Sequence, residues 1–93
     1  MGEIARYVLG RRFDAATSAQ HQAAMLALLT PTMPNLVVDF TEVEFLSSSG
    51  LRVLLVVARQ VAQFGGQLSA VDVCAAVREV IVAAGLDQVL VLA

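Results

Sequence analysis

The sequence is poor in the residues that define several large protein classes. It has one cysteine, Cys74, one histidine, His21, and neither tryptophan nor lysine. A single cysteine excludes an internal disulfide and a zinc site built from several cysteines. Cys74 and His21 together are too few ligands to hold zinc, so we expect no metal centre and no cofactor.

Charged residues are scarce as well, and basic and acidic residues are nearly balanced in number. Six arginines stand against eight acidic residues, which gives a formal net charge of −2 at pH 7. Proteins that bind nucleic acid through its phosphates carry a basic excess, so we expect no nucleic-acid partner. With 58% hydrophobic and 15% charged residues, intrinsic disorder is also excluded.

Long hydrophobic runs are missing despite this apolar composition. A membrane-spanning helix needs about 20 apolar residues in succession, but arginines interrupt the run at 51–59 and Gly85 interrupts the run at 80–93. Glu3 and Arg6 break the N-terminus before the apolar part of a secretion signal can form. We therefore expect a cytoplasmic protein without direct membrane insertion.

What is present is a regular alternation of short apolar segments with longer stretches of helix-forming residues. This alternation predicts a single α/β domain, residues 1–93, with about four mostly parallel strands and three or more helices. The predicted strands are 4–9, 35–40, 67–71 and 89–92, and the predicted helices are 15–29, 48–64 and 75–84. Loops that follow parallel strands meet at the carboxyl ends of the sheet. Functional residues are therefore expected in the loops 10–17, 41–50 and 72–74.

Hydrophobic periodicity predicts which side of each longer helix faces the core. In the first helix the core side is predicted to hold Ala19, Ala23, Leu26 and Leu29, with Asp14 or Thr17 as N-cap and His21 on the solvent side. In the second it is predicted to hold Leu51, Leu54, Leu55, Ala58, Val61 and Ala62, with Val53, Val56 and Val57 on the far side. Exposed aliphatic side chains beside a polar rim predict either a docking surface for a partner or packing in a dimer. Cys74 is expected to be buried or half-buried near the start of the last helix.

Three consecutive serines, Ser47–Ser49, stand at the start of the second predicted helix. One of their hydroxyls is expected to cap the helix by accepting a hydrogen bond from a backbone N–H of the first turn. The same turn favours an anion, and an accessible hydroxyl there can be phosphorylated. No Gly-x-Ser-x-Gly turn surrounds the serines and no acid is in evidence to orient His21, so we do not expect an enzyme.

The stretch around these serines resembles a known family signature. Residues 36–59, LVVDFTEVEFLSSSGLRVLLVVAR, are similar to the signature of STAS domains, in which an apolar strand ending in aspartate leads through a short connection to Asp-Ser-Ser-Gly-Leu. The similarity continues through residues 10–14, 65–68, 77–80 and 85–86 and so covers nearly the whole chain. Within the family, the chain resembles most closely the bacterial anti-sigma factor antagonists.

The resemblance implies a binding switch. Ser48 occupies the position of the serine that a kinase-type anti-sigma factor phosphorylates, with Ser47 and Ser49 as alternatives. In this family the unphosphorylated protein binds the anti-sigma factor, phosphorylation cancels the binding, and a phosphatase restores it. The residues expected to bind the partner are Asp14, Ser47, Ser49, Gly50, Arg52, Val53 and Val56.

Three features depart from the family pattern. Ser47 replaces the aspartate of the motif, and Arg52 places a cation one turn after Ser48. The usual N-terminal edge strand is expected to be lacking, as is a final C-terminal helix, which leaves a sheet edge able to pair with another chain, such as a second copy. A cytoplasmic STAS regulatory subunit of a membrane transporter is the alternative function that the resemblance leaves open.

Overall fold

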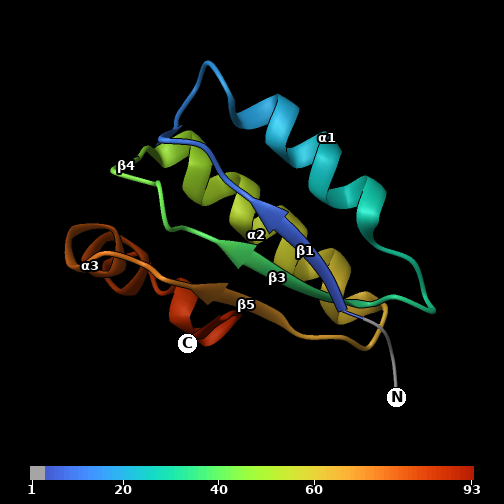
Figure 1. The fold of residues 1–93 in the computed structure, drawn as a ribbon. Helices are drawn as coiled ribbons and strands as arrows, with labels where there is room; N and C mark the ends of the chain where they lie inside the picture. The colour runs from blue at the N-terminus through green and yellow to red at the C-terminus, as the bar shows by residue number, and fades with distance from the viewer. Residues whose placement is uncertain (1–3) are drawn as a thin grey trace.

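The computed structural model describes residues 4–93 as an α/β domain. Its main sheet has four parallel strands in the order β1-β3-β5-β6, as Figure 1 shows for the first three. The strands are β1 (Ile4–Val8), β3 (Asn35–Asp39), β5 (Leu68–Val71) and β6 (Val91–Leu92). The connections between them contain α1 (Ser18–Leu28), α2 (Ser48–Gln63), and α3 (Ala75–Ala83) with the short 3₁₀ helix η1 (Leu86–Gln88). The predicted fold class and the order of the elements are confirmed.

Two short strands form where the sequence predicted only loops. β2 (Arg12–Phe13) and β4 (Phe45–Leu46) pair in parallel, with Arg12 opposite Phe45 and Phe13 opposite Leu46. A strand of two residues is too short to produce a pattern of alternating polarity, so periodicity did not indicate either one. The β2–β4 ribbon joins the two loops that follow β1 and β3, and β4 lies beyond the arrowheads of these strands in Figure 1.

The helices cover one face of the main sheet. Each connection steps in the same direction across the sheet, and right-handed crossovers then place the helices on the same side. Strand side chains on that side are buried, namely Ala5, Leu36, Val38, Leu68 and Ala70. The opposite face carries an exposed ion pair between Arg6 Nη2 and Asp39 Oδ2, 2.8 Å apart, and none of the described residues covers it fully. Within residues 4–93, β1 lies at one edge of the sheet and pairs only with β3.

The buried side of α1 differs from the predicted one. Met25 is fully buried and Leu29 is nearly so, whereas Ala19 and Ala23 are exposed. Alanine and leucine occur on several sides of this helix, so its hydrophobicity varies little around the helix axis. Burying the larger side chains removes more apolar surface from water, and this decides the orientation.

His21 was predicted on the solvent side of α1, and this prediction is wrong. The imidazole is half-buried, with its Nδ1 2.7 Å from the hydroxyl of Tyr7 on β1. Its ring packs edge-on against the rings of Tyr7 and Phe13, at centroid distances of 5.6 and 5.4 Å. Burial lowers the pKa of His21 below its usual value, because a desolvated imidazole favours its neutral form.

The buried side of α2 is rotated relative to the prediction. Its buried residues are Gly50, Val53, Leu54, Val57, Ala58 and Val61. Val53 and Val57 were predicted to face outward, but α1 packs beside α2, as Figure 1 shows, and their exposed fractions are 5% and 0%. Gly50 explains the rotation: a Cβ there would lie 2.7 Å from the Phe13 carbonyl oxygen, so this position faces inward. Positions three, four and seven residues later share its side of the helix.

The remaining differences are local. Cys74 was predicted to be buried or half-buried, but it takes the N-cap position of α3 and is exposed. Its Sγ lies 3.7 Å from the Val43 carbonyl oxygen. None of the helices formed by residues 4–93 combines the length and the apolar character needed to cross a membrane.

Candidate functional site

The start of α2 is tied to the first loop through one backbone carbonyl. The Phe13 carbonyl accepts hydrogen bonds from both the backbone N–H of Ser47, at 3.0 Å, and the Ser47 hydroxyl, at 3.3 Å. The Ser47 hydroxyl oxygen in turn accepts from the backbone N–H of Gly50 at 3.2 Å, which makes Ser47 the N-cap of α2. This confirms that one of the three serines caps the helix. Because its hydroxyl is engaged as donor and as acceptor, Ser47 has a structural role.

The other two serines differ in accessibility. Ser48 is the first residue of α2 and is exposed, whereas Ser49 is half-buried on the side of α2 that faces α1. Gly50 is buried, so it shapes the turn and presents nothing to a partner. Ser48 is therefore the hydroxyl of the three that another protein can reach most directly.

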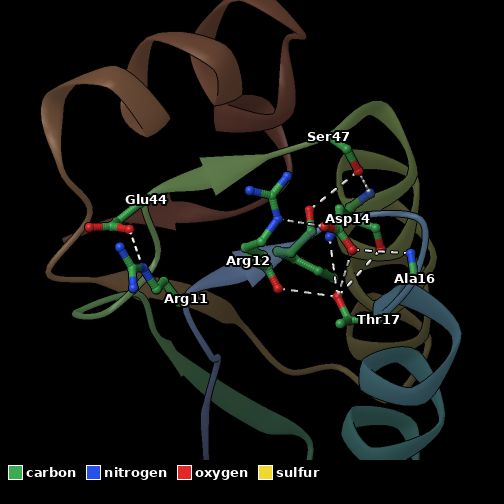
Figure 2. Close-up of polar contacts among 9 residues, drawn as sticks. Arg11, Arg12, Asp14, Ala16, Thr17, Glu44 and Ser47 are labelled. Atoms are coloured by element: carbon green, nitrogen blue, oxygen red, sulfur yellow. Dashed lines mark hydrogen bonds and ion pairs between the residues drawn. The ribbon is translucent and has the colours of Figure 1, made fainter.

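Asp14 lies directly after β2, beside the residue whose carbonyl holds Ser47. Its carboxylate accepts from Arg12 Nε at 2.9 Å and from the backbone N–H of Ala16 at 3.1 Å (Figure 2). The Arg12 guanidinium, more than any other group, stabilises the ionised carboxylate and holds the pKa of Asp14 below its usual value. Thr17 is the N-cap residue of α1, but its hydroxyl donates to the Arg12 carbonyl at 3.1 Å instead of capping the helix. Asp14 and Ser47 thus meet at Phe13, which precedes Asp14 in the chain and whose carbonyl holds Ser47.

The outer surface of the β2–β4 ribbon contains residues that the sequence did not single out. The Arg12 guanidinium lies 4.8 Å from the centroid of the Phe45 ring, which is 44% exposed. Arg11 Nε and Glu44 Oε2 form an exposed ion pair at 2.5 Å. Both pairs join positions about thirty residues apart through the ribbon, and no local pattern indicates such pairing. The one sequence feature that indicates these residues is the succession Arg11-Arg12-Phe13. It lies in a loop that was expected to be functional.

A groove of about 430 Å³ lies between α1 and α2 next to the serines. Most of the side chains that line this groove are small or apolar. The lining residues are Ser18, Ala19, Gln22, Ala23, Leu26, Ser49, Arg52 and Val53. Arg52 is the one charged residue among them. Of the predicted partner-binding residues, the groove gathers Ser49, Arg52 and the edge of Val53, while Val56 is half-buried elsewhere on α2.

The described residues hold no candidate metal centre. Nowhere in residues 4–93 do three histidine, cysteine, aspartate or glutamate side chains gather as ligands. The chemistry at the start of α2 is therefore that of an accessible hydroxyl beside a paired carboxylate, an exposed aromatic ring and a groove.

Comparison with known proteins identifies the family of this fold. A family model described as "Mlab, STAS domain" matches residues 8–92. The chain belongs to the STAS domain family. Among curated proteins, BtrV of Bordetella bronchiseptica, named as an anti-sigma factor antagonist, is 34% identical over 67 residues. The match covers 72% of this STAS domain and 58% of BtrV, so the chain spans less than two thirds of that relative.

Solved structures share the fold at low sequence identity. SpoIIAA in its unphosphorylated form, an anti-sigma factor antagonist, superposes with a TM-score of 0.82 and 21% identity, covering 100% of this chain and 82% of SpoIIAA. TM1081 of Thermotoga maritima gives 0.83 and 14%, covering 97% and 73% of the two chains. The STAS domain of a SulP transporter from Vibrio cholerae gives 0.72 and 21%, covering 92% and 66%. These similarities confirm the predicted STAS fold.

Proposed function

We propose that this STAS domain is a cytoplasmic anti-sigma factor antagonist that is switched off by phosphorylation of Ser48. The observation that carries the proposal is the different state of the three serines: Ser47 is engaged as the helix cap, Ser49 is half-buried, and Ser48 is exposed. The similarity to BtrV, which is named for the same role, supports it.

The groove and the adjoining ribbon surface are the proposed docking site for the anti-sigma factor. Small side chains along the groove allow the backbone of a partner to approach closely, and Arg52 is placed to pair with an acidic side chain of the partner. Phe45 supplies an exposed aromatic ring at the other side of the serines. Interfaces are enriched in such aromatic and arginine residues.

The proposed switch adds charge at the centre of this surface. The partner kinase transfers the γ-phosphoryl group of ATP to the Ser48 oxygen, ADP leaves, and the hydroxyl proton passes to the kinase or to water. The new phosphate carries a charge of about −1.5 to −2 at pH 7. It opposes an acidic partner group at Arg52 and occupies contact volume, so binding is lost until a phosphatase hydrolyses the ester. The domain itself supplies no catalytic group.

Phosphorylation by a kinase-type anti-sigma factor tests this proposal. Incubated with the kinase and ATP, the protein is expected to gain one phosphate, located at Ser48 by peptide mass spectrometry. The unmodified protein should retain the kinase in a pull-down and the phosphorylated protein should release it. Ser48→Ala should remain unmodified yet bind, whereas Ser49→Ala should be modified normally. A phosphate at Ser47 or Ser49, or none at all, would contradict the proposal.

Docking on a membrane transporter is a second candidate function. The specific observation is the shared fold with the STAS domain of the SulP transporter, and also with the murine anion transporter Slc26a9, at a TM-score of 0.72 in both cases. A pull-down from the native host distinguishes the two candidates. Recovery of a permease and no kinase would favour this second function, and recovery of a kinase would favour the first.

A further inference from the structure

Arg12 is held in place in a way that leaves most of its guanidinium available. Its Nε atom donates to Asp14 Oδ2 at 2.9 Å, and its Cζ atom lies 4.8 Å from the centroid of the Phe45 ring. Within residues 4–93 its side chain makes no further hydrogen bond or ion pair, and it is 63% exposed. The two Nη groups, which together carry four N–H donors, are therefore positioned but not engaged by the protein.

The ribbon places this guanidinium close to Ser47, the residue that precedes Ser48. Side chains alternate along a strand, and Phe13 points into the core, so Arg12 and Asp14 point outward. On β4, Leu46 points inward and Phe45 outward, and the chain then leads directly into Ser47. Figure 2 shows Arg12, Asp14 and Ser47 near one another at the end of the ribbon, with the carboxylate of Asp14 bonded to Arg12.

We propose that Arg12 holds the phosphate of phosphorylated Ser48 through its two Nη groups while its Nε keeps the bond to Asp14. This inference rests on the proposed function, since it concerns the modified form of the same site. A guanidinium binds phosphate through two parallel N–H···O bonds, and the two Nη groups of Arg12 offer such a pair while Nε stays bonded to Asp14. Asp14 thus holds the guanidinium in position for the phosphate. The bound phosphate adds negative charge to the surface that the partner must contact.

Arg52 is the competing cation and provides the matched control. It follows Ser48 by four residues on α2, where side chains at this spacing are neighbours. It lies in the wall of the groove on the side of α1 instead of on the ribbon. Arg12 and Arg52 thus approach the phosphate from different elements, and replacing each one separately distinguishes them.

The test uses phosphoserine inserted at position 48 during translation, so it does not depend on any kinase. Phosphorus-31 NMR follows the second ionisation of the phosphate, which has an ordinary pKa of about 6. Arg12→Gln is expected to raise this pKa by about 0.3 to 0.7 pH units, the size of one exposed ion pair. Arg12→Lys, which keeps the charge but loses the paired donors, should raise it less, and Arg52→Gln should change it less than Arg12→Gln.

A second readout follows Asp14 itself by carbon-13 NMR. Phosphoserine at position 48 should raise the pKa of Asp14, because the carboxylate then shares Arg12 with a negative neighbour. If Arg52→Gln shifts the phosphate pKa as much as Arg12→Gln, or if Arg12→Gln leaves it unchanged in a folded protein, the inference is wrong. Failure of a kinase to modify Ser48 would instead contradict the proposed function and leave this result standing.

Discussion

Ser47 replaces the aspartate of the family motif and still caps the helix. Its hydroxyl accepts from Gly50 N and donates to the Phe13 carbonyl, so the backbone of the turn is held as an acidic N-cap would hold it. What the replacement removes is a negative charge next to Ser48. Asp14 is then the carboxylate that pairs with Arg12 at this site. The electrostatics of the proposed switch thus depend on Asp14 and Arg12.

Gly50 is the residue at which the site is most sensitive to an added methyl group. A Cβ there would lie 2.7 Å from both the Phe13 carbonyl oxygen and Leu46 Cδ1. Gly50→Ala is therefore expected to cost about 1–3 kcal/mol of unfolding free energy, the usual size of overpacking in a core. In a domain of this size each kcal/mol lowers Tm by about 4–8 °C.

Gly10→Ala is the matched control for this prediction. An added Cβ at Gly10 meets nothing within 4 Å, so this change should leave the melting temperature nearly unaffected. Thermal denaturation followed by circular dichroism compares the two variants. Equal melting temperatures for both would show that the turn accommodates the methyl group and that Gly50 does not set the rotation of α2.

At the scale of elements, the rotation of α2 decides which valines are available to a partner. Val53 is 5% exposed and packs near α1, whereas Val56 is half-buried. Val53→Asp would bury an unpaired carboxylate, so we expect it to unfold the domain or to lower its stability by about 3 kcal/mol or more. Val56→Asp should cost much less and should weaken binding of the proposed partner, the anti-sigma factor, in the folded protein.

Urea denaturation and a pull-down with the anti-sigma factor together check this pair. The contrast between the variants is the decisive quantity, because both introduce the same charge three residues apart on one helix. Two folded variants of equal stability would show that Val53 is as accessible as Val56. A stable Val56→Asp variant that binds normally would exclude this part of α2 from the interface.

At the scale of the whole molecule, three of the described residues make stability depend on pH in the acid range, namely His21, Asp39 and Asp14. Burial lowers the pKa of His21 below its usual value. Hydrogen bonds donated by Thr41 lower the pKa of Asp39, and a hydrogen bond donated by Arg12 lowers the pKa of Asp14. The unfolded chain binds a proton at His21 before the folded protein does, so stability is complete above about pH 6.5 and falls as the pH drops below it. The two aspartates add a second loss below about pH 4.

His21→Gln isolates the first of these two losses. The urea midpoint of the native protein should fall between about pH 6.5 and pH 5, whereas that of His21→Gln should stay constant over this interval. Both proteins should lose stability below about pH 4, since Asp14 and Asp39 are unchanged. A native midpoint that does not vary between pH 6.5 and pH 5 would show that His21 titrates normally in the folded protein.

Several features of this protein follow from the sequence by itself, because they depend on neighbours along the chain. Apolar segments at 35–40 and 67–71 form strands that bury alternate residues, and proline and glycine mark where they begin. The cap at Ser47 is equally local, since it joins a hydroxyl to an N–H three residues later. The α/β order, the helix that starts at the serines and the family resemblance were predicted for this reason.

Only the tertiary structure decided which side chains meet at the site. The hydrogen bonds from Ser47 to the Phe13 carbonyl join residues that lie 34 positions apart in the sequence. The ribbon that places Arg12 over Phe45 depends on the same contact. The rotation of α2 and the burial of Val53 follow from the close approach of Gly50 to Phe13 and Leu46. A period in the sequence reports how polarity varies around a helix, but the direction in which the helix faces is set by the segments that pack against it.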